Sequence, residues 1–136
     1  MSKTMPTIQK YMTAQPHTIK SSESLINAER EMSKDNIRHL PVVDESDILI
    51  GIISDRDIKM AESIIGSQPS LMTVGNVCHK NPYEVSPNSP LDEVVATMAE
   101  NHYESAVVTQ NNHIVGIFTT MDVCKALKET LQTRYH

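Results

Sequence analysis

The spacing of apolar residues predicts an amphipathic helix in the first part of the chain. Leu25, Ala28 and Met32 recur at intervals of three and four residues, and charged residues stand between them. This spacing places the three side chains on one face of a helix. Ser22 precedes the pattern and belongs to a residue type that commonly caps helix N-termini. The pattern therefore predicts a helix that Ser22 caps and that buries one face.

A different pattern follows this helix. Two apolar runs, 40–43 and 48–53, are rich in β-branched residues and are separated by the polar segment DESD. Such a pair of runs is typical of an antiparallel β-hairpin. A short strand around 17–19 precedes the helix, and a second helix is expected to run from Ser54 towards Ile65. The predicted order of elements is βαββα.

The same order returns in the second half of the chain. The matched residues, at an offset of 66 and then of 65 after a one-residue deletion in the hairpin loop, are Pro16/Pro82, Ile19/Val85, Leu25/Leu91, Met32/Met98, Gly51/Gly116 and Asp57/Asp122. One such unit has a sheet face that it cannot bury alone. We therefore expect an α+β fold in which two βαββα repeats, 8–65 and 74–130, pack sheet to sheet with pseudo-twofold symmetry and flanking helices. Residues 66–73 are the predicted linker.

Composition narrows the class of protein. The 136 residues include 12 Lys and Arg against 17 Asp and Glu, and this acidic balance argues against a nucleic-acid backbone as the main partner. The N-terminus has no apolar signal-peptide core, and the chain has no apolar run long enough to span a membrane. The two cysteines form no CxxC pair. We therefore expect a cytoplasmic protein that is not attached to a membrane.

Candidate binding chemistry lies where the hairpin ends and the second helix begins. Backbone N–H groups and the helix dipole favour anions there. Asp57 can accept two hydrogen bonds from a vicinal diol such as that of ribose. Arg56 opposes the dipole in the first turn and therefore suggests a phosphate nearby. However, Ser54-x-x-Asp57 and Thr119-x-x-Asp122 also fit a purely structural capping box, and this alternative stays open.

Four short motifs carry a resemblance to a known family. RHLPVVD is followed by GIISDRDI, and their counterparts ESAVVT and GIFTTMD recur in the same order. With these motifs the chain, from residue 8 to residue 130, resembles a tandem pair of cystathionine β-synthase (CBS) domains. The resemblance implies a regulatory module that binds AMP, ADP, ATP or S-adenosylmethionine between its repeats. It also implies a homodimer and a regulated partner protein that the sequence does not identify.

The resemblance and the residue chemistry together give a candidate ligand site on the first repeat. Its residues are Thr18, Ile19, Lys20, Arg38, His39, Leu40, Pro41, Ser54, Arg56 and Asp57. The adenine is expected near Thr18, Ile19, His39, Leu40 and Pro41. A second, weaker site would use Val85, Tyr103, Ser105, Ala106, Thr119 and Asp122.

The two candidate sites differ in charge. The cations of the first repeat, Lys20, Arg38 and Arg56, are replaced in the second by Ser86, Glu104 and Met121. The first site is therefore expected to hold a phosphorylated ligand. The second is expected to be weak, empty or suited to an uncharged group.

Two other classes of protein are not expected from this sequence, and a third stays open. A metal protein is not expected, because Cys78 and His79 are adjacent and the other histidines lack ligand spacing. An enzyme is not expected, because the sequence has only four glycines, no phosphate-binding loop and no recognisable pairing of nucleophile and base. A module that has lost ligand binding and serves only to dimerise or to dock on another protein stays open.

Overall fold

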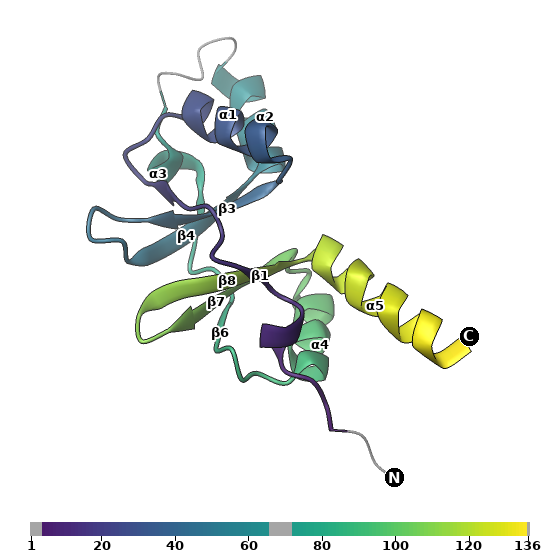
Figure 1. Cartoon of the computed structure of the whole chain (residues 1–136). Coiled ribbons are helices and arrows are strands. Elements are labelled where there is room, and N and C mark those ends of the chain that lie inside the picture. The colour runs from purple at the N-terminus through teal and green to yellow at the C-terminus, as the bar shows by residue number, and fades with distance from the viewer. Residues whose placement is uncertain (1–3, 66–71, 136) are drawn as a thin grey trace. The chain divides into compact units, whose positions relative to one another are not determined.

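A computed structural model describes residues 4–65 and 72–135 of the chain (Figure 1). Most of the predicted linker, residues 66–71, lies outside the described residues. The chain forms two compact units, one of residues 17–82 and one of residues 1–16 together with 83–136. The units are divided differently from the two sequence repeats, because the leading segment of each repeat belongs to the unit that the other repeat mainly builds.

The unit of residues 17–82 consists of a four-stranded sheet with helices packed on it (Figure 1). The strand order is β2-β3-β4-β5, in which β2 is parallel to β3 and the other pairs are antiparallel. The elements are β2 (Ile19–Lys20), α1 (Leu25–Asp35), β3 (His39–Val43), β4 (Leu49–Ser54), α2 (Asp55–Ile65), α3 (Val74–Val77) and β5 (His79–Lys80).

The second unit repeats this arrangement. Its sheet has the order β1-β8-β7-β6, with β6 parallel to β7 and the other pairs antiparallel. The elements are η1 (Ile8–Lys10), β1 (Thr13–Ala14), β6 (Glu84–Val85), α4 (Leu91–Asn101), β7 (Ser105–Gln110), β8 (His113–Thr119) and α5 (Thr120–Tyr135). The hairpins of both units have a register irregularity at corresponding places, after Val42 and after Val108. The α+β class and the repeated βαββα order are confirmed.

The first predicted helix forms, but a different serine caps it. Leu25, Ala28 and Met32 are buried on one face of α1, as expected. The cap is Ser24, whose hydroxyl oxygen accepts a hydrogen bond from the Asn27 amide at 3.2 Å. The prediction that Ser22 caps this helix is wrong because α1 begins at Leu25, so only Ser24 stands directly before its first turn.

Each sheet has a fourth edge strand that the apolar pattern did not predict. Strand β5 pairs with β4 through Gly51–Lys80 and Ile52–His79, and β1 pairs with β8 in the corresponding way. Gly51 allows this close approach, because a Cβ atom there would lie 2.7 Å from the carbonyl oxygen of His79. Two residues are too few for a strand to show periodicity. The order βαββα predicts three strands in each sheet, and the structure has four.

Each unit has its own hydrophobic core. The buried core of the unit 17–82 contains Ile19, Leu25, Ala28, Met32, Leu40, Val42, Ile53, Ile58, Ala61, Val74 and Cys78. The core of the other unit contains Ile8, Val94, Met98, Ala106, Val108 and Phe118. Val74 and Ile8 show that the leading segments contribute side chains to these cores as well as edge strands. Within residues 4–65 and 72–135, no helix has both the length and the apolar character needed to cross a membrane.

Candidate ligand site

The candidate site of the first repeat is built where β3 begins and β4 ends. His39 and Ser54 are directly paired across the two strands. The Asp55 amide donates a hydrogen bond to the Arg38 carbonyl oxygen at 2.9 Å, which holds the start of α2 against the residue before β3. This pairing places Arg38 and His39 beside Ser54, although they are distant in sequence.

Asp57 has a structural role at this position. The Ser54 amide donates to Oδ2 of Asp57 at 2.9 Å, and the Asp57 amide donates to Oγ of Ser54 at 3.1 Å. Both hydrogen bonds of a reciprocal capping box are therefore formed. The other carboxylate oxygen, Oδ1, lies 3.0 Å from Nε2 of His79. The His79 side chain is 73% exposed, so a ligand can displace it without disturbing the cap.

The candidate phosphate partners lie at the surface. Nζ of Lys20 is 3.6 Å from a carboxylate oxygen of Glu45, and Nη1 of Arg38 is 3.5 Å from Oδ2 of Asp55. Arg56 is exposed in the first turn of α2. Exposed ion pairs contribute at most about 1 kcal/mol. Lys20 and Arg38 can therefore exchange their present partners for a bound anion at small cost.

The apolar residues predicted to contact the adenine are buried in the protein. The side chains of Ile19 and Leu40 belong to the hydrophobic core, and Leu40 is fully buried. Pro41 is also fully buried. In this conformation Ile19 and Leu40 can offer a ligand their backbone groups, while their side chains maintain the sheet. Thr18 is exposed.

A groove of about 460 Å³ is lined in part by three of the predicted residues, Thr18, Ile19 and Lys20. Its lining residues are Thr18, Ile19, Lys20, Glu23, Asn27, Arg30, Glu31, Val43 and Asp47. Ser54, Arg56 and Asp57 do not line it. The structure therefore divides the predicted residues of the first repeat into one group along β2 and another at the start of α2.

The corresponding strand end of the second repeat has the same backbone pairing but a more enclosed aspartate. Ser105 pairs with Thr119, as His39 pairs with Ser54. Asp122 is only 6% exposed. Its Oδ2 accepts from the Thr119 amide at 2.9 Å, and its Oδ1 accepts from the Thr13 hydroxyl at 3.2 Å.

The remaining residues predicted for the second site lie in β6, in β7 and between α4 and β7. Ala106 is fully buried in the core, and Val85 packs against that core. The ring of Tyr103 lies 5.2 Å from that of Tyr83, centroid to centroid, so Tyr103 already has an aromatic partner. Met121 occupies the position that corresponds to Arg56 and is 63% exposed.

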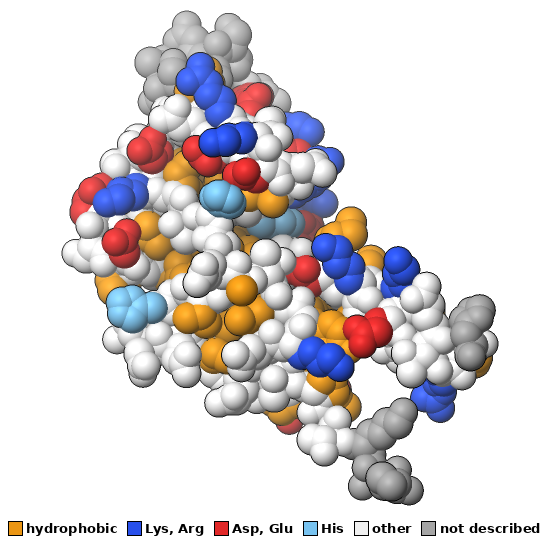
Figure 2. Space-filling view, in the orientation of Figure 1, with side chains coloured by type: hydrophobic (Ala, Val, Ile, Leu, Met, Phe, Trp, Pro, Cys, Tyr) orange, Lys and Arg blue, Asp and Glu red, His pale blue; other side chains and the backbone are white. Residues whose placement is uncertain are grey.

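The charged side chains on the visible face are of both signs (Figure 2). On the face shown in Figure 2, acidic and basic side chains are interspersed over α1 and α2. Binding to a nucleic-acid backbone requires a row or patch of basic groups. The visible face therefore agrees with the acidic composition.

Two histidines that contact aspartates in the folded chain were not predicted from the sequence. His79 meets Asp57 from β5, and His17 meets Asp35 of α1 at 3.2 Å. A weak signal existed for His79, which corresponds to Thr13 at the repeat offset of 66. No spacing rule connects His17 with α1.

Comparison with known protein families decides the class of the chain. The family model for the CBS domain matches residues 8–63 and 74–129, which together make up most of the chain. The chain belongs to the CBS domain family. Its CBS domains form a tandem pair, as the resemblance implied.

Relatives of the tandem CBS pair are found among characterised and solved proteins. Hypoxic response protein 1 of Mycobacterium tuberculosis is 29% identical over 92% of this chain and 87% of its own length. The crystal structure of the protein AcuB from Vibrio cholerae has a TM-score of 0.84 and 28% identity, covering 98% of this chain and 99% of that one.

A third relative carries information on ligands. The CBS domain pair of protein MJ0100 has a TM-score of 0.82 and 25% identity, covering 93% of this chain and 99% of that one. It was crystallised with 5′-methylthioadenosine and S-adenosyl-L-methionine. Several curated enzymes also match this chain, but over only 15% to 25% of their own length. These enzymes resemble it through their CBS parts.

Proposed function

We propose that this CBS pair binds an adenosine-containing ligand beside Asp57 and acts as a regulatory module without catalytic activity of its own. The carrying observation is the carboxylate of Asp57 at the start of α2, with Oδ1 outside the capping hydrogen bonds. The relative crystallised with two adenosine compounds supports this ligand class. Both compounds contain a ribose diol, whose hydroxyl groups can donate hydrogen bonds to a carboxylate oxygen.

The charges of the two repeats support a phosphorylated ligand in the first. Lys20, Arg38 and Arg56 all lie on the unit that carries Asp57. Guanidinium groups form strong, charge-assisted hydrogen bonds with phosphate. The proposed ligand is therefore AMP, ADP or ATP, with S-adenosylmethionine as the alternative that lacks phosphate.

Regulation follows from a difference in affinity. A ligand that binds one arrangement of the repeats better than another shifts the population towards it. A partner protein that prefers the same arrangement then binds more tightly, and the coupling is reciprocal. The proposed role is to report the ligand concentration to such a partner.

The first test is thermal unfolding of the full chain with millimolar AMP, ADP, ATP, 5′-methylthioadenosine or S-adenosylmethionine. At a ligand concentration of 100 Kd, binding to the folded state alone adds about 2.7 kcal/mol, which raises Tm by several degrees. No shift with any of the five compounds would contradict ligand binding.

The second test assigns the residues by calorimetric titration. R56A is expected to weaken AMP about tenfold or more, since it removes a charge-assisted contact, and to change adenosine binding little. D57A is expected to weaken both ligands. M121A is the matched control at the corresponding position of the second repeat. Equal losses of AMP and adenosine affinity in R56A would contradict the phosphate contact.

One observation favours the second candidate function, a dimerisation or docking module. Leu127, Leu131 and Tyr135 follow each other at intervals of four on α5 and are 55%, 46% and 72% exposed. Such a stripe on one helix face is suited to covering by another helix. We expect a homodimer in light scattering, and we expect L127E/L131E to be monomeric. A wild-type monomer would remove this support.

A further inference from the structure

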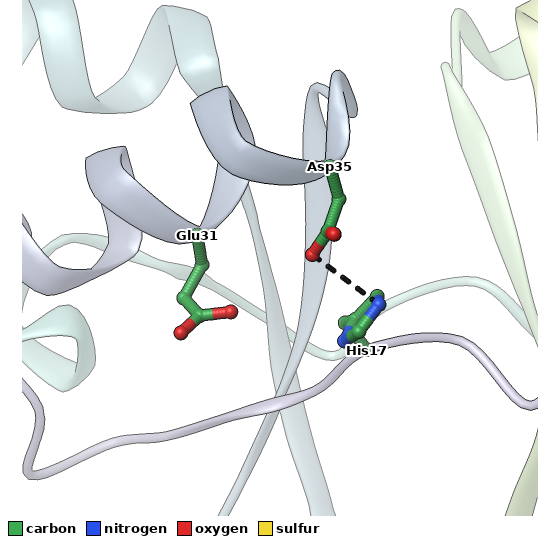
Figure 3. A group of neighbouring side chains, drawn as sticks. All are labelled: His17, Glu31 and Asp35. Atoms are coloured by element: carbon green, nitrogen blue, oxygen red, sulfur yellow. Dashed lines mark ion pairs between the residues drawn. The ribbon is translucent and has the colours of Figure 1, made fainter.

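Three side chains with metal-binding atoms converge beside the C-terminal end of α1 (Figure 3). His17 lies in the extended segment before β2, and Glu31 and Asp35 belong to α1. The spacing of four residues places the two carboxylates on one helix face. One potential ligand atom from each residue lies within 4.8 Å of the other two.

The spacing of His17 and Asp35 already suits a small metal ion. Nε2 of His17 lies 3.2 Å from Oδ2 of Asp35. Two ligand atoms on a tetrahedral zinc ion, with bonds of about 2.1 Å, are about 3.4 Å apart. The Glu31 carboxylate would reach the same ion through a rotation of its side chain, which has three rotatable torsions.

One carboxylate oxygen of Asp35 is a second observation at this place. Oδ2 of Asp35 is buried from solvent and accepts no hydrogen bond, although His17 lies close to it. Buried polar atoms without a hydrogen bond are uncommon in proteins, and coordination of an ion is one way in which such an atom is satisfied. A cation between the imidazole and the carboxylates would satisfy this oxygen.

The charges favour a divalent cation. Glu31 and Asp35 lie in the last turns of α1, where the helix dipole disfavours anions. With a neutral imidazole, the three side chains carry a net charge of −2. Lys34 is the basic residue in the last turn of the helix. A divalent ion would balance both the carboxylates and the negative end of the dipole.

We propose that His17, Glu31 and Asp35 form a binding site for Zn²⁺ or a similar divalent transition-metal ion. Imidazole nitrogen suits this group of metals, whereas Mg²⁺ and Ca²⁺ prefer oxygen ligands alone. Three protein ligands leave one position of a tetrahedral ion open to water or to another ligand. The bound ion would tie the segment before β2 to α1. The site is separate from Asp57 and goes beyond the proposed function.

The test is calorimetric titration of ZnCl₂ into the metal-free full chain. We expect one ion per chain, with affinity reduced at least tenfold in H17A and in D35N. E31Q, which changes a single side chain without altering its size, is expected to weaken binding as well. MgCl₂ is expected to give no binding. Circular dichroism of each variant confirms that it is folded.

Two control variants report other zinc ligands. H113A removes an exposed histidine of β8, and C124S removes the exposed thiol of α5. Both are expected to bind zinc as the wild type does. Wild-type affinity in H17A and D35N, or loss of binding in C124S, would overturn the site. So would a wild-type chain that binds no zinc, since His17 and Asp35 would then be an ion pair only.

Discussion

The imidazole of His79 lies 3.0 Å from Oδ1 of Asp57 and links β5 to the first turn of α2. In the other unit, the corresponding contact is made by Thr13, whose hydroxyl donates to Oδ1 of Asp122 at 3.2 Å. Each capping aspartate therefore meets a side chain from the short edge strand of its sheet. In the unit of residues 17–82 that side chain is an exposed imidazole, which occupies the oxygen proposed for the ligand diol.

The first prediction concerns competition between His79 and the ligand. H79A is expected to raise adenosine affinity by up to about fivefold, because an exposed contact of this kind is worth at most about 1 kcal/mol. Calorimetric titration of adenosine measures the change. T13V, which alters the corresponding contact at Asp122, is expected to leave this affinity unchanged. A lower affinity in H79A would show that the imidazole contacts the ligand instead of competing with it.

The second prediction compares two equivalent glycines. At Gly51, an added Cβ would meet the backbone carbonyl of His79 and the sulfur of Cys78. At Gly116, it would meet the flexible side chain of Met12. Since backbone moves less readily than a methionine side chain, G51A is expected to cost about 2–3 kcal/mol and G116A about 1 kcal/mol or less.

Urea unfolding of the two glycine variants measures this difference. Equal losses in G51A and G116A would show that the close approach of β5 is not what requires a glycine at position 51.

The third prediction tests the cap of α1. S24A removes the oxygen that accepts from the Asn27 amide and is expected to cost about 1 kcal/mol of unfolding free energy. S22A removes only a contact with Glu45 at the surface and is expected to cost less than about 0.5 kcal/mol. A larger loss in S22A than in S24A in urea unfolding would contradict the position of the helix start.

The fourth prediction concerns pH. A side-chain hydrogen bond with Glu29 raises the pKa of Glu62 above its ordinary value, and burial and the negative charges of Glu29 and Asp55 act in the same direction. The folded state therefore binds this proton more readily than the unfolded state. Its contribution to stability decreases as pH rises from the unfolded pKa through the folded pKa.

E62Q removes the unfavourable charge and is expected to stabilise the protein at pH 7 by a few tenths of a kcal/mol, given the exposure of the pair. At pH 4 the difference from the wild type is expected to disappear. Thermal unfolding at the two pH values measures both. An equal gain at pH 4 would mean that charge is not the cause.

The hairpins and the longer helices could be predicted because each is long enough to show a period, whereas η1 and α3 were not predicted. Leu25, Ala28 and Met32 define one face of α1, and the β-branched run of β4 is bounded by polar residues. Strands β1 and β5 have two residues each, and their place depends on long-range contacts such as Gly51 with His79. These contacts leave no periodic trace in the sequence.

The candidate sites divide in the same way. Ser54 and Asp57 could be identified from their spacing, and the structure shows that this spacing forms the capping box. His17 and Asp35 are 18 residues apart and meet only because the segment before β2 passes beside α1. The expectation that the histidines lack ligand spacing considered neighbours in sequence, and such a rule cannot detect ligands that folding brings together.

The edge strands β1 and β5 tie the two repeats together, because each repeat supplies the outermost strand of the other repeat's sheet. A chain cut in the linker would leave each half with a leading segment that has no sheet and a sheet that lacks its outermost strand. Two identical short chains would complete one another by trading these segments. The tandem chain thus has, within one polypeptide, the strand exchange of a domain-swapped dimer of two repeats.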